Sequence, residues 1–277
     1  MPVRSSADLH WTATVLAVSR PLLLLPPSEA KASGGDLVEP TDSFHLALRS
    51  RRIEVRQAVR RELRGDEERL ASLFKARGDL LERAVVSWRR TVLGRSTLLP
   101  AWRRYQGVVW VYLDPATIAS SAREDILVPS GFYGVNSAED EIADYRLSMS
   151  VSLSGVGRLS SFWRAPLSAA LAERSAGRTL VDLLTAENRQ ALDIDLLRKS
   201  ARVVTVRFLA ADGSRAIGHE AKAAKGRLAR AILDQGVDVA ASFEWEGWRA
   251  SLEGDEVRVL APGRPRAGRT SPPTSGN

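Results

Sequence analysis

The residues best suited to chemistry in this chain are lysines and arginines that stand beside hydroxyl or carboxylate side chains. The segment Ser28–Lys31 (SEAK) places a hydroxyl, a carboxylate and an ammonium group within four positions. It follows the apolar run Leu22–Leu25 and two prolines, an arrangement typical of a buried strand that ends in a loop. Loops at the carboxyl ends of buried strands hold the ligands of open α/β folds. We therefore expect a functional loop here, with an ordinary solvated loop as the alternative.

Basic residues in other segments extend this candidate site. The chain has only five lysines, and three of them, Lys31, Lys222 and Lys225, stand near the starts of loops or helices. Such groups can clamp a phosphate or carboxylate and stabilise developing negative charge, while a carboxylate can act as a base or bind magnesium. The candidate catalytic residues are Lys31, Glu29, Tyr133, Arg146, Asp182 and Lys222, and the candidate substrate- or phosphate-binding residues are Ser28, Tyr145, His219, Lys225 and Arg227.

This set predicts an enzyme with a basic, polar pocket for a nucleotide, phosphorylated or carboxylate substrate. A nucleotide-dependent transferase or ligase of specialised metabolism would use ATP and Mg²⁺, which are the cofactors we expect in that case. No Walker loop, dinucleotide-binding glycine motif or HExxH motif is present, so no named reaction is indicated. The alternative for Tyr133, Tyr145 and the pair Phe162-Trp163 is that they are ordinary core aromatics.

Composition excludes several other kinds of site. The chain has no cysteine, which rules out disulfides, thiolate nucleophiles, iron–sulfur clusters and cysteine-ligated zinc. Its histidines, His10, His45 and His219, are far apart in the sequence, so we predict no histidine-based metal site. No apolar run approaches the ~20 residues that cross a bilayer. We expect a monomeric, cytoplasmic protein.

The basic charge of the chain is concentrated in one region. Residues 51–104 hold 15 basic and seven acidic side chains, a net charge of +8, whereas the whole chain carries +7. The rest of the chain is therefore nearly neutral, which favours an anion-facing surface over the alternative of a uniformly arginine-rich genome. Arginines recur every four residues from Arg52 to Arg64 and would form a stripe along one helix face.

Two shorter helices, predicted over 67–75 and 80–93, follow this stripe and are joined by the tight turn Ala76–Asp79. Helices joined in this way beside basic residues suggest a helix-hairpin-helix, which grips the phosphates of duplex DNA. Only Gly78 remains of the usual glycine-hydrophobic-glycine hairpin, and a solvated helical pair is the alternative. Phosphate contacts without base reading would come from Arg52, Arg56, Arg60, Arg64, Lys75, Arg77, Arg83, Arg89 and Arg90.

The elements that position these residues alternate between helix and strand, which predicts an α/β fold with a mixed central sheet and flanking helices. Expected strands are 22–25, 126–128, 179–183, 203–208, 215–219, 243–245, 248–252 and 257–260, with 203–208 and 215–219 paired around a turn. Expected helices include 43–94 with two breaks, 186–192 and 222–236. Ser43, Ser161 and Thr185 are the expected helix N-caps.

One domain over residues 21–260 accounts for these elements, with a basic helical subregion at about 43–104. Residues 1–20 form an expected N-terminal extension, with a signal peptide as the less favoured alternative. Residues 261–277, rich in proline, glycine, serine and arginine, predict a disordered tail.

Six motifs along the chain resemble, in order, those of the YaaA family of peroxide-stress proteins. Pro26–Lys31 resembles the opening PPSEGK motif, Ser130–Gly134 (SGFYG) the SGLYG segment, and Tyr145–Met149 (YRLSM) the YRL-S/E-M segment. The FW pair at 162–163, the VDL strand at 181–183 and the basic segment His219–Arg227 complete the series. The resemblance extends from about residue 22 to residue 260.

The resemblance implies a basic cleft, a helix-hairpin-helix, binding to double-stranded DNA and a role in limiting iron-driven damage during peroxide stress. The chain also departs from the family pattern inside the motifs. The glycine before the loop lysine is Ala30, the proline before the YR pair is Ala143, and the pair after the late histidine is Glu220-Ala221. These substitutions indicate a diverged member, for which the enzyme remains the alternative function.

Overall fold

The apolar run after residue 21 forms the centre of the largest sheet. In the computed structural model, which describes residues 20–38 and 42–263, β1 (Leu22–Leu24) pairs in parallel with β3 (Ile126–Ser130) on one side. On its other side it pairs in parallel with β8 (Thr179–Asp182). Leu22–Leu25 is fully buried, as expected for a strand whose two faces are both covered. The strand predicted from the leucine run is confirmed.

The other strands extend this sheet in both directions. From edge to edge its eight strands are β10 (Glu244–Trp245), β11 (Trp248–Glu253), β12 (Glu256–Leu260), β9 (Arg202–Leu209), β8, β1, β3 and β4 (Gly134–Ser137). The five strands from β12 to β3 are parallel, and β4, β11 and β10 are antiparallel to their neighbours. The mixed α/β fold predicted from the sequence is confirmed.

The order of the strands creates a switch point beside β1. The chain passes from β1 to β3 on one side of it and later enters β8 on the other side. The loops that leave β1 and β8 therefore run to opposite faces, and such a divergence opens a crevice at the carboxyl ends of the strands.

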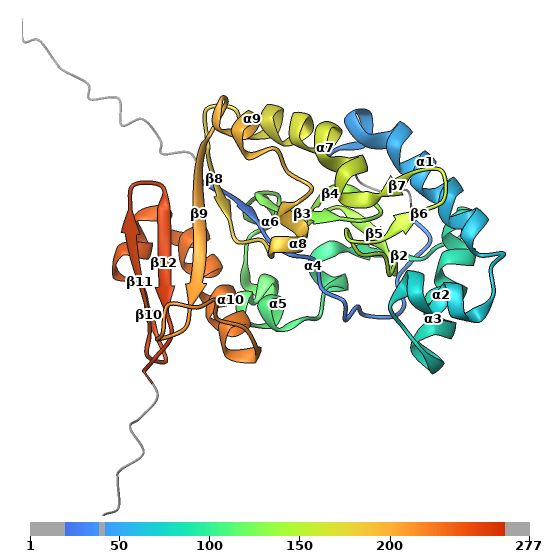
Figure 1. The fold of residues 1–277 in the computed structure, drawn as a ribbon. Helices are drawn as coiled ribbons and strands as arrows, with labels where there is room; N and C mark the ends of the chain where they lie inside the picture. Colours follow the sequence, from blue (N-terminus) through green and yellow to red (C-terminus); the bar gives the residue numbers. More distant parts are fainter. Residues whose placement is uncertain (1–19, 39–41, 264–277) are drawn as a thin grey trace, which may run out of the picture.

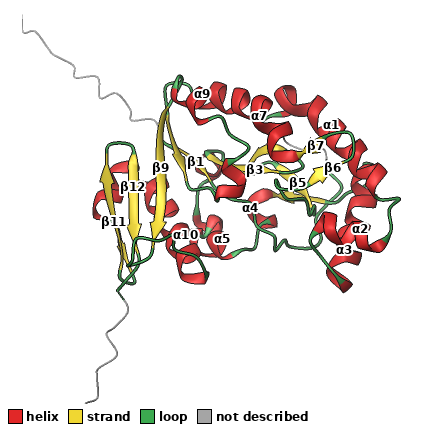
Figure 2. Ribbon diagram, viewed as in Figure 1, coloured by secondary structure: helices red, strands yellow, loops and turns green. Residues whose placement is uncertain are grey.

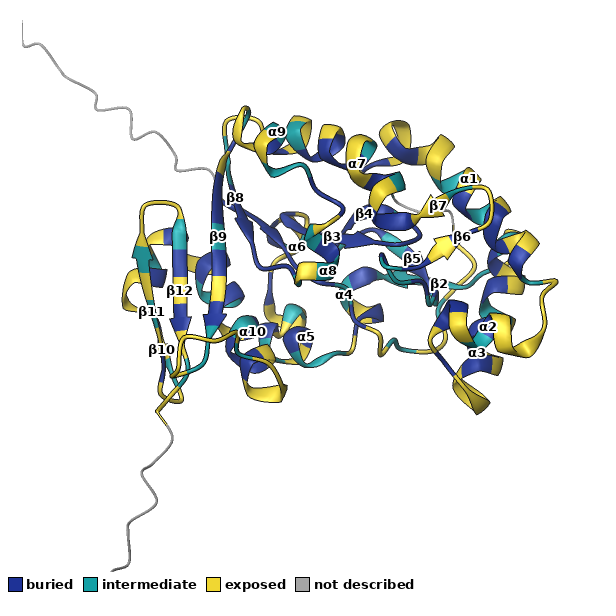
Figure 3. Cartoon of the chain, in the orientation of Figure 1, coloured by how far each residue is buried: buried dark blue, intermediate teal, exposed yellow. Residues whose placement is uncertain are grey.

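Helices cover both faces of this sheet (Figure 1, Figure 2). One layer holds α7 (Leu159–Ser175) and α9 (Ile194–Arg198), and the other holds α5 (Val108–Leu113) and α10 (His219–Gln235). Figure 3 shows the central strands buried, while the helices expose one side and bury the other. Among the described residues, no helix is both long and apolar enough to span a bilayer.

The basic region forms a helical group at the end of the molecule away from β10, β11 and β12 (Figure 1). It contains α1 (His45–Glu62), α2 (Glu67–Phe74) and α3 (Gly78–Val92). Asp66 caps α2 by accepting a hydrogen bond from the Arg69 amide, and Lys75 ends α2 in the left-handed conformation. The predicted helical pair and its short turn are present, and their use as a helix-hairpin-helix remains a prediction.

Smaller elements complete the described part of the chain. They are β2 (Leu98–Pro100), α4 (Ala101–Arg104), η1 (Pro115–Thr117), α6 (Ser120–Arg123), β5 (Glu141–Ala143), β6 (Ser152–Leu153), β7 (Gly157–Arg158), α8 (Ala186–Arg189) and η2 (Val237–Ser242). The predictions for residues 1–19 and for the tail beyond residue 263 lie outside the described residues.

Two of the three expected N-caps are wrong. The Ser43 hydroxyl donates to the Asp140 carboxylate (2.6 Å), and the residue before α1 is Phe44. Ser161 lies inside α7, which begins at Leu159. For Ser43 a long-range contact decided the outcome, because its polar partner comes from a distant segment. Thr185 is confirmed as the cap of α8.

The strand expected at 215–219 is also wrong. Arg215 forms only an isolated bridge with Leu209, and His219 already begins α10. The predicted turn is present, and the Ala216 amide donates to the Phe208 carbonyl (2.9 Å) on the part of β9 that β8 does not pair with, but the pairing ends there because the chain turns into α10.

Gly226 on α10 lies where this helix packs closely against α5. A Cβ at Gly226 would come within 2.8 Å of the Tyr112 Cβ and 2.9 Å of the Leu113 amide nitrogen on α5. We expect Gly226→Ala to lower the free energy of unfolding by about 1–3 kcal/mol, because the two helices must separate. Denaturant titration measures this change. Gly263→Ala, which meets no atom within 4 Å, is the control, and equal stability of both variants would contradict the argument.

Candidate functional site

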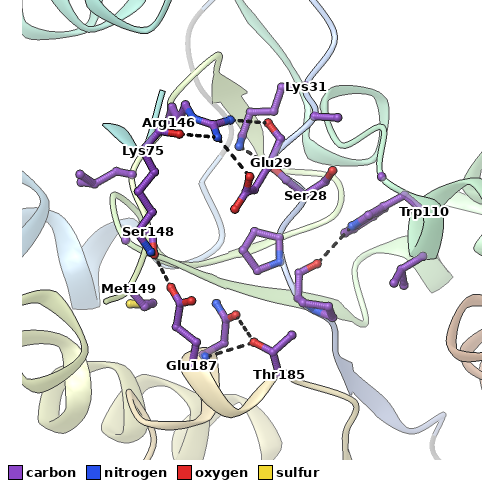
Figure 4. A pocket seen from close by; sticks show the side chains of 18 of the residues that line it. Ser28, Glu29, Lys31, Lys75, Trp110, Arg146, Ser148, Met149, Thr185 and Glu187 are labelled. Carbon is purple, nitrogen blue, oxygen red and sulfur yellow. Dashed lines mark hydrogen bonds and ion pairs between the residues drawn. The ribbon is translucent and has the colours of Figure 1, made fainter. Parts of the chain in front are cut away.

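A cavity of about 430 Å³ lies at the switch point, where the segments that follow β1, β3 and β8 meet (Figure 4). Its wall includes Pro26–Lys31 after β1, Gly131 after β3, and Thr185 with its neighbours after β8. The N-terminal part of α5, the segment after β5, the end of α2 and one face of α10 complete it. Eight of the residues predicted from the sequence line it: Ser28, Glu29, Lys31, Lys75, Tyr145, Arg146, Lys222 and Lys225.

The cations of the cavity come from segments that are far apart in the sequence. Lys31 follows β1, Arg146 follows β5, and Lys222 lies on α10, yet all three line the same hollow. Five basic side chains line the cavity against the two acidic side chains of Glu29 and Glu187. The expectation that these cations converge is therefore met, and the cavity is suited to an anion.

Lys31 is held by a carbonyl and two aromatic rings. Its Nζ donates to the backbone oxygen of Ser28 (2.7 Å) and lies 4.4 Å from the ring centroid of Tyr145. The ring of Tyr105 is 5.5 Å away. Among the described residues Lys31 forms no ion pair within 4.0 Å. The amine is therefore positioned without a carboxylate partner.

These surroundings change the acidity of the amine. Burial is the main reason that the pKa of Lys31 falls from 10.5 to about 7. The nearby Asp144 carboxylate opposes this shift, and the positive charge of Arg146 reinforces it. Arg104 adds a smaller contribution of the same sign as Arg146. Lys31 therefore exchanges its proton close to neutral pH.

Arg104 fixes the loop that carries Lys31. Its guanidinium is completely buried and donates to the carbonyl oxygens of Ala32 (2.5 Å), Gly34 (3.1 Å) and Ile142 (3.3 Å). These carbonyls satisfy the donors but leave the positive charge unneutralised. Arg104 thus holds the loop backbone and also contributes to the low pKa of Lys31.

Arg146 is anchored by the end of a helix. Its Nε donates to the carbonyl of Phe74 (2.7 Å), and one terminal nitrogen donates to the carbonyl of Lys75 (3.2 Å). The carboxyl end of a helix carries partial negative charge, which favours a cation there. The same terminal nitrogen also pairs with the Glu29 carboxylate (3.1 Å), whose side chain is 80% exposed. Figure 4 draws this contact between Arg146 and Glu29.

Lys225 is a second lysine of the cavity whose pKa is lowered. Its Nζ donates to the carbonyl of Leu183 (2.6 Å), and burial lowers its pKa from 10.5 to about 8. The Asp182 carboxylate opposes this shift. Asp182 itself is fully buried, does not line the cavity, and accepts hydrogen bonds from Arg189 (2.6 Å) and the Leu184 amide (2.9 Å).

The wall facing Lys31 carries hydroxyl groups and a second carboxylate. Lys75 donates to the hydroxyl oxygens of Ser150 (2.7 Å) and Ser148 (3.2 Å), and Ser148 donates to Glu187. Burial would raise the pKa of Glu187, but hydrogen bonds from Ser148 and Ser150 and the charge of Lys75 outweigh it and lower the pKa. Glu187 is therefore held as a carboxylate.

The remaining predicted residues lie away from the cavity lining. Tyr133 stands behind Tyr145, with ring centroids 5.4 Å apart, and its hydroxyl accepts from the Ala143 amide. The core-aromatic alternative fits Tyr133, whereas Tyr145 is both buried and part of the cavity wall. His219 and Arg227 are exposed on α10 and approach Tyr112 instead, at 6.3 and 5.5 Å.

Several lining residues were not predicted from the sequence. Ser148, Met149, Thr185, Glu187 and Asn188 line the cavity. The last three follow β8, so the rule that pointed to the loop after β1 also applies to them. Gly107, Val108, Val109 and Trp110 complete an apolar wall, and no local pattern marks them.

Of the nine basic residues predicted to contact DNA, four are paired, partly buried or turned to the cavity, and five are exposed and unpaired among the described residues. Arg52 is nearly buried, pairs with Asp42 and donates to the carbonyls of Tyr133 and Val135, so it does not extend an exposed stripe. Arg83 pairs with Asp144, and Lys75 faces the cavity. Arg56 is half-buried. The five that are exposed and form no ion pair within the described part of the chain are Arg60, Arg64, Arg77, Arg89 and Arg90.

Comparison with known sequences identifies the family. A family model described as "Peroxide stress protein YaaA" matches residues 22–253. This chain belongs to the YaaA family. A UPF0246 protein of Streptomyces coelicolor is 34% identical over 255 residues, which cover 88% of this chain and 95% of that protein. A UPF0246 protein of Corynebacterium glutamicum is 33% identical over 216 residues, covering 76% of this chain and 84% of that relative.

The YaaA family motifs fall mainly around the cavity. Pro26–Lys31 lines it, and Ser130–Gly134 and Tyr145–Met149 each contribute lining residues. Within the described residues, no group of three or more histidine, aspartate or glutamate side chains is placed to hold a metal ion. The basic cleft implied by the resemblance thus corresponds to a cavity with cationic side chains.

The low pKa of Lys31 gives a direct test of the site geometry. With limiting acetic anhydride, we expect the labelling rate of Lys31 to rise with pH and reach half its maximum near pH 7, because the neutral amine reacts. Peptide mass spectrometry after labelling at several pH values measures this, with exposed Lys199 as internal reference.

The variant Arg104→Gln tests whether the buried charge of Arg104 contributes to the low pKa of Lys31. Removal of the buried positive charge should shift the labelling midpoint of Lys31 to higher pH, whereas Arg198→Gln on the exposed face of α9 should leave it in place. A Lys31 profile that coincides with that of Lys199 in the wild-type protein would show that the amine is not desolvated.

Proposed function

We propose that the cavity is the active site of an enzyme that acts on a small substrate carrying a phosphate or carboxylate group. The observation that supports this most is the convergence of Lys31, Arg146 and Lys222 from separate segments on one hollow. Among the described residues Lys31 has no carboxylate partner within 4.0 Å and Arg146 pairs only with the exposed Glu29, so an anionic ligand would compensate these two charges. The switch point of an open α/β sheet is also where ligands of such folds bind.

The side chains of the cavity are suited to different roles, anion binding for Arg146 and Lys222 and proton transfer for Lys31. Arg146 presents a planar group suited to two oxygens of a phosphate or carboxylate, and Lys222 adds a mobile charge. Lys31, with a pKa of about 7, is suited to accept a proton from the substrate at neutral pH. The apolar wall that includes Val108 and Trp110 would contact a less polar part of the substrate and limit water.

The reaction class is a transfer or ligation that uses a nucleotide. ATP is the cosubstrate that fits the cationic lining, and Mg²⁺ would enter bound to its phosphates, which is the usual way that this ion is held. Glu29 and Glu187 are the carboxylates of the cavity that could approach it.

Binding of inorganic pyrophosphate and of ATP tests this proposal. We expect each to raise the melting temperature of the wild-type protein, since a ligand of the folded state stabilises it. Arg146→Met and Lys222→Met should each weaken binding about tenfold, because each removes a charge-assisted contact of about 1.5–3 kcal/mol. Isothermal titration calorimetry measures the loss.

Lys199→Met is the control, because Lys199 is exposed on the surface beyond α9 and should not affect binding. Equal affinities for the wild-type protein and both cavity variants would place the anion site elsewhere.

A second candidate function is binding to duplex DNA during peroxide stress. The name of the matching family refers to peroxide stress, and the exposed arginines of α1 and α3 favour a partner with many phosphates. Arg60, Arg77 and Arg89 belong to this set and lie in the helical group at one end of the molecule. Such contacts would be independent of base sequence.

Charge reversal tests the DNA surface separately from the cavity. Arg60→Glu combined with Arg64→Glu should abolish most binding to a duplex of arbitrary sequence, because phosphate contacts supply the affinity. The slope of the logarithm of the binding constant against the logarithm of the salt concentration should also fall by about one unit for each lost contact. Fluorescence anisotropy at several salt concentrations measures this. Arg198→Glu on α9 is the matched charge control, and Lys31→Ala should leave DNA binding unchanged. Undiminished binding by the double variant would eliminate this surface.

A further inference from the structure

We propose that Lys31 acts as a nucleophile and forms a covalent imine with a 2-oxo acid, a small molecule with a ketone or aldehyde carbon beside a carboxylate. The proposal rests on the cavity being the active site and goes further by naming the substrate class and the bond that forms. It is argued from the partners of the amine, the charges around it and the space in front of it.

The partners of Lys31 leave its nitrogen able to react. Its hydrogen bond goes to the backbone oxygen of Ser28, which accepts from the amine in either protonation state. A lysine paired with a carboxylate is kept as an ammonium ion, which has no lone pair for attack. Among the described residues Lys31 has no such partner within 4.0 Å. The carbonyl therefore positions the nitrogen without fixing its proton.

The surroundings favour the neutral amine and a dry reaction. Burial together with nearby cations lowers the pKa of Lys31 to about 7, so about half of the molecules carry a free amine at that pH. Neighbouring cations and apolar walls are the recognised means of activating a lysine for attack on carbonyl carbon. The rings of Tyr145 and Tyr105 cover one side of the nitrogen, which limits the water that would hydrolyse an imine.

Arg146, near the Lys31 amine, can bind the carboxylate of the substrate. Arg146 lies close enough to Lys31 to lower its pKa, and both side chains line the cavity. The Glu29 carboxylate that now contacts Arg146 is 80% exposed and can move into solvent when another carboxylate arrives. Lys222 supplies a second cation. The cavity, about 430 Å³, has room for a small oxo acid.

Lys225 is the natural comparison within the same cavity. It also donates to a backbone carbonyl and also has a lowered pKa, about 8. Burial is the main cause in both cases, and carboxylates oppose the shift in both, Asp182 for Lys225 and Asp144 with Glu29 for Lys31. Because the pKa of Lys31 is the lower of the two, Lys31 should react ahead of Lys225 at neutral pH.

The chemical step balances without an external oxidant or reductant. The neutral Lys31 nitrogen attacks the carbonyl carbon, a C–N bond forms as the π bond of the carbonyl breaks, and one proton passes from the nitrogen to the oxygen to give a carbinolamine. The hydroxyl group then leaves as water with one further proton, and the product is a protonated imine. Its positive charge draws electrons from the neighbouring carbon on the side away from the carboxylate, which would permit loss of a proton from that carbon and formation of an enamine.

Reductive trapping on the wild-type protein tests the proposal. Pyruvate and sodium cyanoborohydride are added near pH 7, and the borohydride supplies the hydride that converts an imine into a stable amine. We expect one adduct for each chain, mapped to Lys31 by peptide mass spectrometry, at least about tenfold above the labelling of exposed Lys199. Acetone, which has the ketone but no carboxylate, should label Lys31 far less.

Variants separate the covalent step from anion binding. Lys31→Arg should lose the adduct while it still binds pyrophosphate, and Arg146→Met should retain the lysine but lose the preference for pyruvate over acetone. Adducts spread evenly over the five lysines, or found first on Lys225, would overturn the proposal.

If no adduct forms while pyrophosphate still binds, the imine is refuted and the enzyme proposal stands. If the wild-type protein neither forms an adduct nor binds pyrophosphate, both the imine and the enzyme proposal are refuted. Because the mapping uses the wild-type chain, the result does not depend on whether a variant folds.

Discussion

The parallel pairing of β1 with both β3 and β8 is the constraint on which the rest of this structure depends. A parallel arrangement places the carboxyl ends of the strands at one edge of the sheet, and the divergence beside β1 leaves a space between the outgoing segments. The apolar Leu22–Leu25 can form the central strand only when both its faces are covered by helices. The same arrangement therefore buries the core and opens the cavity.

Two lysines of the cavity and a buried arginine near Lys31 form no ion pair among the described residues. Arg104 is completely buried and bonded to carbonyl oxygens, Lys31 is bonded to a carbonyl, and Lys225 is bonded to another. Hydrogen bonds of this kind satisfy the donors, but the burial still disfavours the charged form of each lysine. A site arranged in this way gains most from an anionic ligand, and it keeps amines that can lose a proton near neutral pH.

The helical group and the cavity are joined through the end of α2. The carbonyls of Phe74 and Lys75 hold the Arg146 guanidinium, while the Lys75 side chain reaches the two serines near Glu187. The α2 end therefore sets the position of two cavity cations, although α1 and α3 present their exposed arginines elsewhere on the surface. The two proposed functions use different surfaces of one domain, and variants can separate them.

Local sequence patterns predicted much of the fold and the centre of the site. The leucine run, the SEAK segment, the family motifs and the strands near residues 180, 205 and 250 all carry signals that depend on neighbouring residues. Lys31 and Arg146 could be chosen because charged residues at the ends of apolar segments rarely serve packing alone, and Lys222 because it is one of only five lysines and stands near the start of a helix.

Tertiary structure decided which side chains face one another. It placed Arg52 in an ion pair with Asp42, Asp182 beneath the cavity against Arg189, and His219 beside Tyr112. It also limited 215–219 to an isolated bridge with β9, because the chain turns into α10 at His219. The sequence by itself determined the elements and the chemical groups that the chain carries. Only the packing of distant segments determined their burial and partners, because those depend on contacts that no local pattern encodes.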